Sequence, residues 1–190
     1  PKGNTVAAAE YIISLIFLMI KKLLLISEMV KKNDFSRHKI TLRQLDSMKI
    51  GIVGIGNLGI ELSKRLQSFG CKLIGFDPYS NKINSFQEYG GISTLNLNFL
   101  LKQCDIIILA ANLTSQSEYM ININNINYIK KGAFFINCAR AKLIEQRALI
   151  SALDKKIIAF AAIDLIEPEP KYIIKKNFYH PLINHPNVFY

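Results

Sequence analysis

The sequence has no tryptophan, only three cysteines and only 14 acidic residues among its 190. The cysteines (Cys71, Cys104 and Cys138) are odd in number and far apart, which excludes a disulfide-stapled secreted scaffold. No CxxC pair is present, and the three histidines at positions 38, 180 and 185 lack the spacing of metal ligands. We therefore expect no metal site.

The shortage of acidic residues leaves a net charge of +10, with 24 basic residues against 14 acidic ones. Such a charge can serve a polyanionic partner. However, isoleucine, lysine and asparagine number 30, 19 and 16, about a third of the chain, whereas arginine occurs five times. This bias is typical of AT-rich coding sequence, and the basic residues are scattered singly or in pairs. We therefore predict no nucleic-acid partner.

Long apolar runs are also scarce. Residues 11–20 are almost wholly apolar, but Glu10 and Lys21 bracket only these ten residues, and a membrane span needs about twenty. The segment also lacks the basic start and the small-residue cleavage site of a signal peptide, so we expect none. We predict instead a helix over 5–32, buried in the core or in a subunit interface, and no membrane partner. The expected location is the cytoplasm, with an organelle left open.

From Lys49 onward short apolar segments alternate with amphipathic ones, after a polar connecting loop at 33–47. A parallel sheet covered on both faces has this pattern, so the expected fold is α/β, a doubly wound, Rossmann-type sheet. Strands are predicted at 49–54, 72–77, near 92, 105–110, 132–137 and 157–164, and helices at 57–70, 97–103, 115–121, 123–129 and 142–153.

A GxGxxG motif follows the first of these strands and opens a helix. Gly54 permits a tight turn, Gly56 lets the backbone approach a pyrophosphate, and Gly59 lets the helix pack closely on the strand. Asp77 ends the next strand, where it can accept hydrogen bonds from the adenosine ribose and repel a 2′-phosphate. The alternative is a glycine turn that binds nothing. The complete context predicts NAD as cofactor, in preference to NADP.

Two polar segments follow later strands, where ligands of such sheets bind. Arg140, just beyond 132–137, can hold a carboxylate through two hydrogen bonds, or can be a surface arginine paired with an acid. Asp164, just beyond 157–164, would lie near the nicotinamide, and Glu169 stands between two prolines. An ordinary acidic turn is the alternative for this last segment.

The chain resembles the NAD-binding domain of the D-isomer-specific 2-hydroxyacid dehydrogenases, and within that family most closely the phosphoglycerate dehydrogenase branch. The resemblance covers nearly the whole chain, in the family's order and spacing. It is carried by PKGNTVAAAE (1–10), KIGIVGIGNLGIELSKRLQSFGCKLIGFDPY (49–79), LLKQCDIIILA (100–110), KKGAFFINCAR (130–140) and AAIDLIEPEP (161–170).

This resemblance implies roles by position. Arg140 matches the arginine that binds the substrate carboxylate, and Glu169 matches the glutamate that pairs with the catalytic histidine. The histidine itself is expected beyond Tyr190, and we expect both ends of the chain to be cut from a longer protein. The cofactor contacts implied by motif and resemblance together are Gly54, Gly56, Asn57, Leu58, Gly59, Asp77, Pro78, Cys138, Ala139 and Asp164.

The resemblance also implies the organisation of the protein. The whole chain is expected to be the cofactor domain of a two-domain enzyme, with 1–32 as a dimer-interface helix, 33–47 as a connecting loop and 48–190 as the dinucleotide fold. The substrate domain is expected to be absent from this chain. The expected partners are a 2-hydroxy or 2-oxo acid and a second copy of the protein, bound through the helix at 5–30. 3-Phosphoglycerate, feeding serine synthesis, is the expected substrate.

Three positions depart from the family pattern. Ala141 and Lys142 stand where glycines are usual, and Ala110 begins a stretch where the family usually has His-x-Pro-Leu. A side chain near the active-site loop could crowd the substrate. An NAD-binding regulatory module without catalysis therefore remains as the alternative function.

Overall fold

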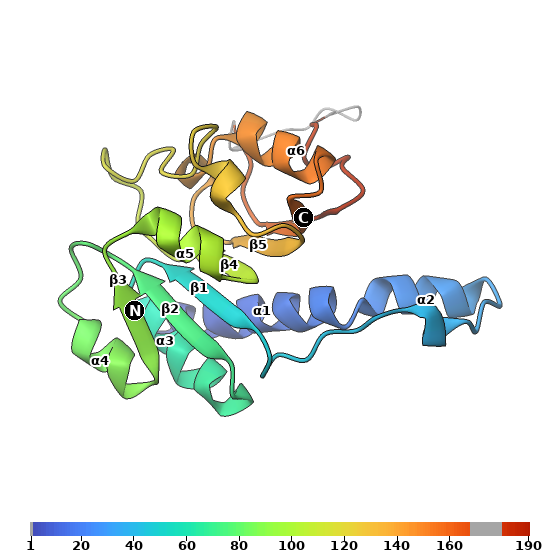
Figure 1. Cartoon of the computed structure of the whole chain (residues 1–190), viewed down its shortest axis with the longest axis horizontal. Helices are drawn as coiled ribbons and strands as arrows, with labels where there is room; N and C mark the ends of the chain where they lie inside the picture. Colours follow the sequence, from blue (N-terminus) through green and yellow to red (C-terminus); the bar gives the residue numbers. More distant parts are fainter. Residues whose placement is uncertain (1, 168–179) are drawn as a thin grey trace.

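The centre of the molecule is a parallel sheet of seven strands in the order β3-β2-β1-β4-β5-β6-β7. The computed structural model describes residues 2–167 and 180–190 (Figure 1). The chain moves outward from β1 to one edge and then from β4 to the other, so the strand order reverses between β1 and β4. The strands are β1 (Lys49–Val53), β2 (Lys72–Phe76), β3 (Gly91–Thr94), β4 (Ile106–Leu109), β5 (Ala133–Asn137), β6 (Ile158–Ile163) and β7 (Val188–Phe189).

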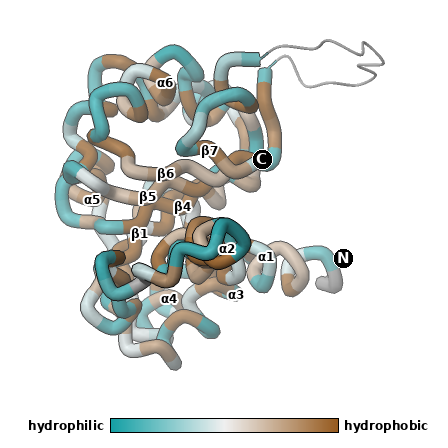
Figure 2. Tube along the Cα trace, turned by 90° about the vertical axis from the view of Figure 1, so that its right-hand side faces the viewer, coloured by the Kyte–Doolittle hydropathy of each residue, from teal (hydrophilic) through white to brown (hydrophobic). Residues whose placement is uncertain are grey.

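Alternate residues of each strand point to opposite faces of the sheet. Both faces are apolar, and helices cover both of them. Ile50 and Ile52 of β1 pack in one apolar cluster and Val53 in the other. The first cluster contains residues of α1 (Lys2–Ile20), α3 (Asn57–Leu66) and α4 (Ile83–Glu88); the second contains residues of α5 (Leu97–Gln103) and α6 (Gln146–Asp154). Figure 2 shows the hydrophobic residues concentrated in the strands between these layers. The doubly wound fold predicted from the sequence is confirmed.

All six predicted strands are present, but the two helices predicted between β4 and β5 are wrong. Residues 115–120 form turns and a bend, Ile121 forms an isolated β-bridge with Ile144, and 123–129 contain only the 3-10 turn η3 (Ile126–Tyr128) as regular structure. Asparagine side chains take the place of helical hydrogen bonds here: Asn125 Oδ1 accepts from the Asn122 N–H at 2.9 Å, and Asn122 Nδ2 donates to the Tyr119 carbonyl at 2.9 Å. Such local side-chain bonds compete with a helix. Helix α4 was not predicted, because it is only six residues long.

The amino-terminal segment is two helices rather than one. α1 ends at Ile20 and α2 (Leu23–Lys31) begins after Lys22, whose backbone is left-handed with φ 49°. Ile12 and Ile16 of α1 are fully buried, so α1 belongs to the core. In contrast, α2 has no buried residue and projects away from the sheet (Figure 1). Along the described ranges 2–167 and 180–190, no helix is long and apolar enough to cross a bilayer.

The short 3-10 turns complete the described elements. They are η1 (Arg37–Lys39), which lies within 33–47, η2 (Gln67–Phe69), η3, and η4 (Ala141–Leu143). η2 and Gly70, with φ 71°, end the predicted helix 57–70, and η4 stands at the start of the predicted helix 142–153. Within that last range regular α-helix begins only at Gln146, and α6 continues one residue beyond the range, to Asp154.

Candidate functional site

A cleft of about 840 Å³ opens at the carboxyl ends of the central strands. This is the edge at which parallel α/β sheets bind ligands, and the cleft has the size of a small-molecule site. It spans the point between β1 and β4 where the strand order reverses. Its walls include the glycine turn after β1, the loop after β2, the loop after β4, the segment Cys138–Arg140 after β5, and Thr5 of α1.

The glycine turn has the shape that a dinucleotide requires. Gly54 has φ 107°, and a Cβ there would lie 2.5 Å from the backbone nitrogen of Ala111. A Cβ on Gly59 would lie 2.3 Å from the Gly54 carbonyl oxygen, so α3 can approach β1 only with glycine at this position. A Cβ on Gly56 would meet nothing within 4 Å, and Gly56 lines the cleft. The space beside Gly56, at the amino terminus of α3, is therefore open to a phosphate.

Asp77 follows β2 and lies at the same end of the cleft. Its Oδ2 accepts from the Ile55 N–H at 2.9 Å and its Oδ1 from the Tyr79 N–H at 3.0 Å. Each carboxylate oxygen has a second lone pair, so both can still accept a ribose hydroxyl. The half-buried carboxylate thus connects the glycine turn with the loop after β2, and Pro78 lines the cleft beside it.

Arg140 lies at the other end of the cleft, on a turn that Asn137 holds in place. Asn137 is 1% exposed, its Nδ2 donates to the Arg140 carbonyl at 2.9 Å, and its Oδ1 accepts from the Ala139 N–H at 3.2 Å. The Arg140 side chain is exposed, and one of its five N–H groups, on Nη1, donates to the Ala139 carbonyl at 2.7 Å. Four donors remain for an anion. The sequence gives no sign of this positioning role of Asn137, which its burial and its two hydrogen bonds establish.

Cys138 and Asp164 lie side by side at the ends of β5 and β6. The Asp164 N–H donates to the Asn137 carbonyl at 3.1 Å, and the Asp164 side chain is exposed. Burial, with a smaller contribution from the Asp164 carboxylate, raises the pKa of the Cys138 thiol to about 12. Burial, Cys138 and Asp164 together raise the pKa of Tyr11 on α1. Cys138 is therefore a neutral thiol in the cleft wall, not a nucleophile.

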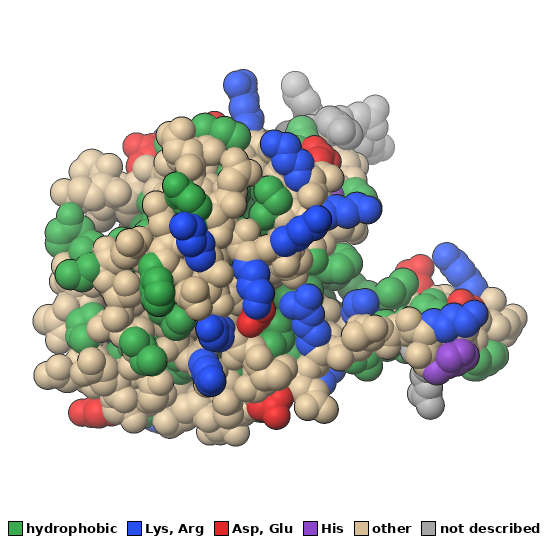
Figure 3. All heavy atoms as spheres, viewed as in Figure 1, with side chains coloured by type: hydrophobic (Ala, Val, Ile, Leu, Met, Phe, Trp, Pro, Cys, Tyr) green, Lys and Arg blue, Asp and Glu red, His purple; other side chains and the backbone are tan. Residues whose placement is uncertain are grey.

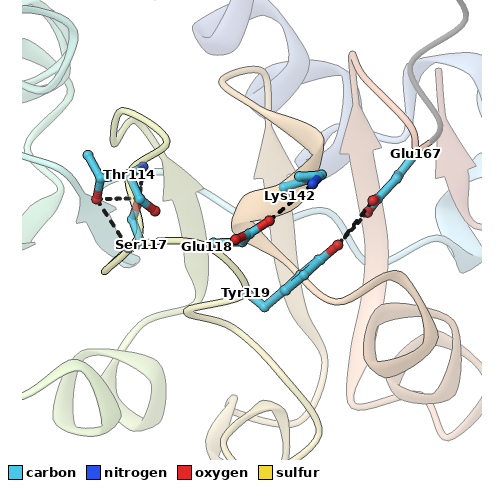
Figure 4. A network of polar contacts seen from close by, with 6 residues as sticks. All are labelled: Thr114, Ser117, Glu118, Tyr119, Lys142 and Glu167. Carbon is cyan, nitrogen blue, oxygen red and sulfur yellow. Dashed lines mark hydrogen bonds and ion pairs between the residues drawn. The ribbon is translucent and has the colours of Figure 1, made fainter.

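A polar network joins the loop after β4 to the Arg140 turn and to the segment after β6 (Figure 4). Lys142 Nζ donates to Glu118 Oε1 at 3.1 Å, and the Tyr119 hydroxyl lies 2.9 and 3.0 Å from the two carboxylate oxygens of Glu167. Tyr119 holds this position with a left-handed backbone, φ 50°. Lys142 thus points to Glu118 and not to Arg140. Glu169, two residues after Glu167, lies outside the described residues.

The structure adds polar residues that sequence reasoning did not select. Ser80, Lys82, Thr114 and Ser117 line the cleft together with Thr5. The Ser117 hydroxyl accepts from the Thr114 N–H at 2.8 Å and donates to the Asn112 carbonyl at 2.7 Å, which shapes the loop after β4. For Ser80, Lys82, Thr114 and Ser117 the sequence offers one signal, their position after β2 or β4, and for Thr5 of α1 it offers none. Among the predicted site residues, Gly59 packs beneath the turn and Asp164 lies beside Cys138. The cleft is lined by the other described ones: Gly54, Gly56, Asn57, Leu58, Asp77, Pro78, Cys138, Ala139 and Arg140.

Comparison with known proteins identifies the family of this chain. Residues 13–190 match the model of the family described as D-isomer specific 2-hydroxyacid dehydrogenase, NAD binding domain. The chain belongs to this family. The family and the cofactor NAD predicted from the sequence are thereby confirmed.

Individual relatives of this dehydrogenase domain share about a third of its residues. D-3-phosphoglycerate dehydrogenase of Bacillus subtilis is 31% identical over 183 residues, which are 96% of this chain and 34% of the relative. D-lactate dehydrogenase of Streptococcus agalactiae is 31% identical over 201 aligned residues, covering 100% of this chain and 59% of the relative. The chain therefore spans about a third to three fifths of the length of these relatives.

Solved structures have the same fold as this dehydrogenase domain. A D-lactate dehydrogenase from Treponema pallidum superimposes with a TM-score of 0.87 at 31% identity, over 98% of this chain and 58% of that protein. A D-lactate dehydrogenase from Aquifex aeolicus, complexed with NAD and lactic acid, gives 0.86 at 28% identity, over 99% and 58%. Across the described part of the dehydrogenase domain, no cluster of three or more His, Cys, Asp or Glu side chains could hold a metal ion.

Proposed function

We propose that the chain is the cofactor domain of an enzyme that moves a hydride between C2 of a D-2-hydroxy acid and NAD. The observation that carries this proposal is that the glycine turn and Arg140 line one cleft, at opposite ends. A dinucleotide with its phosphates beside Gly56 would extend along the cleft, where Ala110 after β4 and Cys138 after β5 would line the space for its nicotinamide. A substrate held by Arg140 would meet it there.

The residues of this chain bind and orient the reactants. The donors of Arg140 hold the substrate carboxylate, and Asn137 fixes the turn that carries them. NAD, when bound, accepts the hydride from C2. A general base must take the hydroxyl proton, and we assign it to a histidine beyond Tyr190 that pairs with Glu169. The domain division at 32 and 47, a separate substrate domain and a cytoplasmic location belong to the same proposal.

The departures from the family pattern are compatible with an enzyme. Ala141 is 2% exposed and packs in the core, and Lys142 pairs with Glu118 (Figure 4). Among the hydrogen bonds and ion pairs of the described residues, neither side chain contacts the guanidinium of Arg140. Ala110 and Ala111 line the cleft with small side chains, which leaves room for the nicotinamide.

For the substrate we propose 3-phosphoglycerate, with D-lactate as the second candidate. The phosphoglycerate dehydrogenase of B. subtilis and the D-lactate dehydrogenases are equally similar to this chain. The test is NADH absorbance with each acid at mildly alkaline pH, using the chain joined to the remaining length that its relatives have. Oxidation of 3-phosphoglycerate supports the proposal and a place in serine synthesis. NAD binding without oxidation of any D-2-hydroxy acid would replace it by the regulatory module.

Asp77 should make the chain prefer NAD to NADP by at least about tenfold in Kd, roughly 1.4 kcal/mol. Its carboxylate is positioned against the ribose end of the cleft and would face a 2′-phosphate. Titration of the 190-residue chain with both cofactors measures the ratio, and Asp77→Asn should reduce it. Equal affinities of the unchanged chain would remove the specificity role of Asp77.

We further propose that two copies of the chain associate through α2. Leu23, Leu24 and Leu25 are each about half exposed, and Figure 3 shows hydrophobic side chains on this projecting segment. An isolated helix of nine residues that buries nothing is marginal in water, so it needs a partner surface.

The association can be measured by light scattering. The chain should scatter at about twice 21.5 kDa at micromolar concentration. Leu24→Glu should give monomers, because it places a charge in the contact. Leu95→Glu is the matched control, since Leu95 is also exposed but lies on the loop before α5. A monomeric unchanged chain would contradict the dimer.

A further inference from the structure

Three of the side chains that line the cleft carry a full charge: Asp77, Lys82 and Arg140. Arg140 lies at the substrate end. Asp77 and Lys82 both belong to the loop 77–82, between β2 and α4, at the end where the glycine turn receives the phosphates. Within the described residues, Lys82 is thus the cation of the cleft's phosphate end, and the proposed function gives it no role so far.

Lys82 lies close to the amino terminus of α3. Its Nζ donates to Oδ1 of Asn57, which is the first residue of that helix. The loop is held at this place by a second contact, because the Ser80 hydroxyl donates to the Ile55 carbonyl at 2.6 Å and accepts from the Lys82 N–H at 3.0 Å. The ammonium is therefore fixed across the mouth of the glycine turn.

The charge of Lys82 is not neutralised by the carboxylate on the same loop. The two Asp77 oxygens accept from the Ile55 and Tyr79 N–H groups, and no ion pair between Lys82 and Asp77 is present among the described residues. An ammonium has three N–H donors, and the neutral Asn57 amide takes one of them. Two donors and a full positive charge thus stand at a helix amino terminus, where anions bind.

We propose that Lys82 is a phosphate-binding residue of this cleft and contacts the pyrophosphate of NAD. This inference rests on the proposed function. The Asn57 amide holds the ammonium at the turn, and its remaining donors take phosphate oxygens as charge-assisted hydrogen bonds. Lys82 lies on the loop after β2, outside the GxGxxG motif, so the motif gives no sign of it.

The partner is the pyrophosphate, not the 2′-phosphate of NADP. Lys82 bonds to Asn57 on α3, and the helix amino terminus is where a pyrophosphate sits in such folds. The ribose end is instead marked by the Asp77 carboxylate, which repels a 2′-phosphate. A contact with the pyrophosphate would weaken the binding of both NAD and ADP-ribose when Lys82 is replaced. A contact with the 2′-phosphate would weaken only the binding of NADP.

The experiment is calorimetric titration of Lys82→Gln in the 190-residue chain with NAD, ADP-ribose, adenosine and NADP. We expect Kd for NAD and ADP-ribose to rise about tenfold, the effect of losing one charge-assisted contact, and adenosine binding to be unchanged. Lys82→Arg should bind NAD within about threefold of the unchanged chain, because it restores the charge. Raising the salt concentration should weaken NAD binding less in Lys82→Gln than in the unchanged chain.

The matched control is Lys72→Gln, which removes the same charge from the exposed first residue of β2. This residue lies at the amino end of the strand, whereas the cleft lies at the carboxyl ends. This variant should bind NAD normally. Unchanged NAD affinity in Lys82→Gln, a loss confined to NADP, or an equal loss for adenosine would each overturn the inference. If the unchanged chain does not bind NAD, the proposed function fails instead, so the two failures are distinguishable.

Discussion

Gly56→Ala should abolish measurable NAD binding while leaving the fold intact, whereas Gly59→Ala should destabilise the fold itself. The two glycines belong to one motif but meet different surroundings. A Cβ on Gly56 enters the open cleft and meets no protein atom within 4 Å, so it takes the space of the pyrophosphate. The φ of Gly56 is −89°, which alanine adopts without strain.

The Gly59 variant has no such freedom. Its Cβ would lie 2.3 Å from the Gly54 carbonyl oxygen, a backbone atom that cannot move aside. We expect a loss of about 3 kcal/mol in the free energy of unfolding, or roughly 10 °C in Tm. Thermal denaturation and NAD titration of both variants separate the two effects. A destabilised Gly56→Ala, or a Gly59→Ala as stable as the unchanged chain, would contradict the assignment.

Arg140→Lys should lower kcat/KM for the hydroxy acid by about 10²–10³, and Arg140→Ala by more. Lysine keeps the charge but cannot offer two parallel donors to one carboxylate. Kd for NAD should change little, because the phosphates bind at the other end of the cleft. The measurement is steady-state kinetics on the chain joined to the remaining length of its relatives. The 190-residue chain alone should bind NAD and show no turnover, because the general base is expected beyond it.

Arg147→Lys is the matched control for this prediction. Arg147 is an exposed residue of α6 that does not line the cleft. Its substitution should leave kcat/KM within about twofold. If Arg140→Lys retained full activity, another residue would have to hold the substrate carboxylate. The proposal that the cleft binds phosphates at the glycine turn and the substrate at Arg140 would then be wrong.

The sequence predicted the strands well because each buried strand is a short continuous apolar run, and the dinucleotide motif is local. Contacts that depend on distant residues were out of reach. Asn137 is one of several polar residues near strand ends, and only its burial and its two bonds to the Arg140 turn assign it a positioning role. The proposed role of Lys82 depends on its hydrogen bond to Asn57 of α3, a contact between distant segments that the sequence does not show.

The wrong helices have a related physical cause. Residues 115–129 have enough apolar positions for helices, but Asn122 and Asn125 bond to nearby backbone groups and favour turns. The break at Lys22 was missed for another reason. A lysine pair is compatible with a continuous helix, so the sequence gives no local sign of the left-handed backbone at Lys22.

The position of Gly54 makes the cofactor site a late product of folding. The turn is recognised in the sequence as a local motif, yet the wall that Gly54 faces is the backbone at Ala111, 57 positions later, beyond the end of β4. A peptide limited to β1, α3 and β2 would carry every motif residue without that wall. The turn can therefore reach its final shape only after β4 has paired with β1, a contact of high sequence separation that forms slowly. Capture of NAD during refolding would thus report the completion of the centre of the sheet, and bound NAD would stabilise that completed state by mass action.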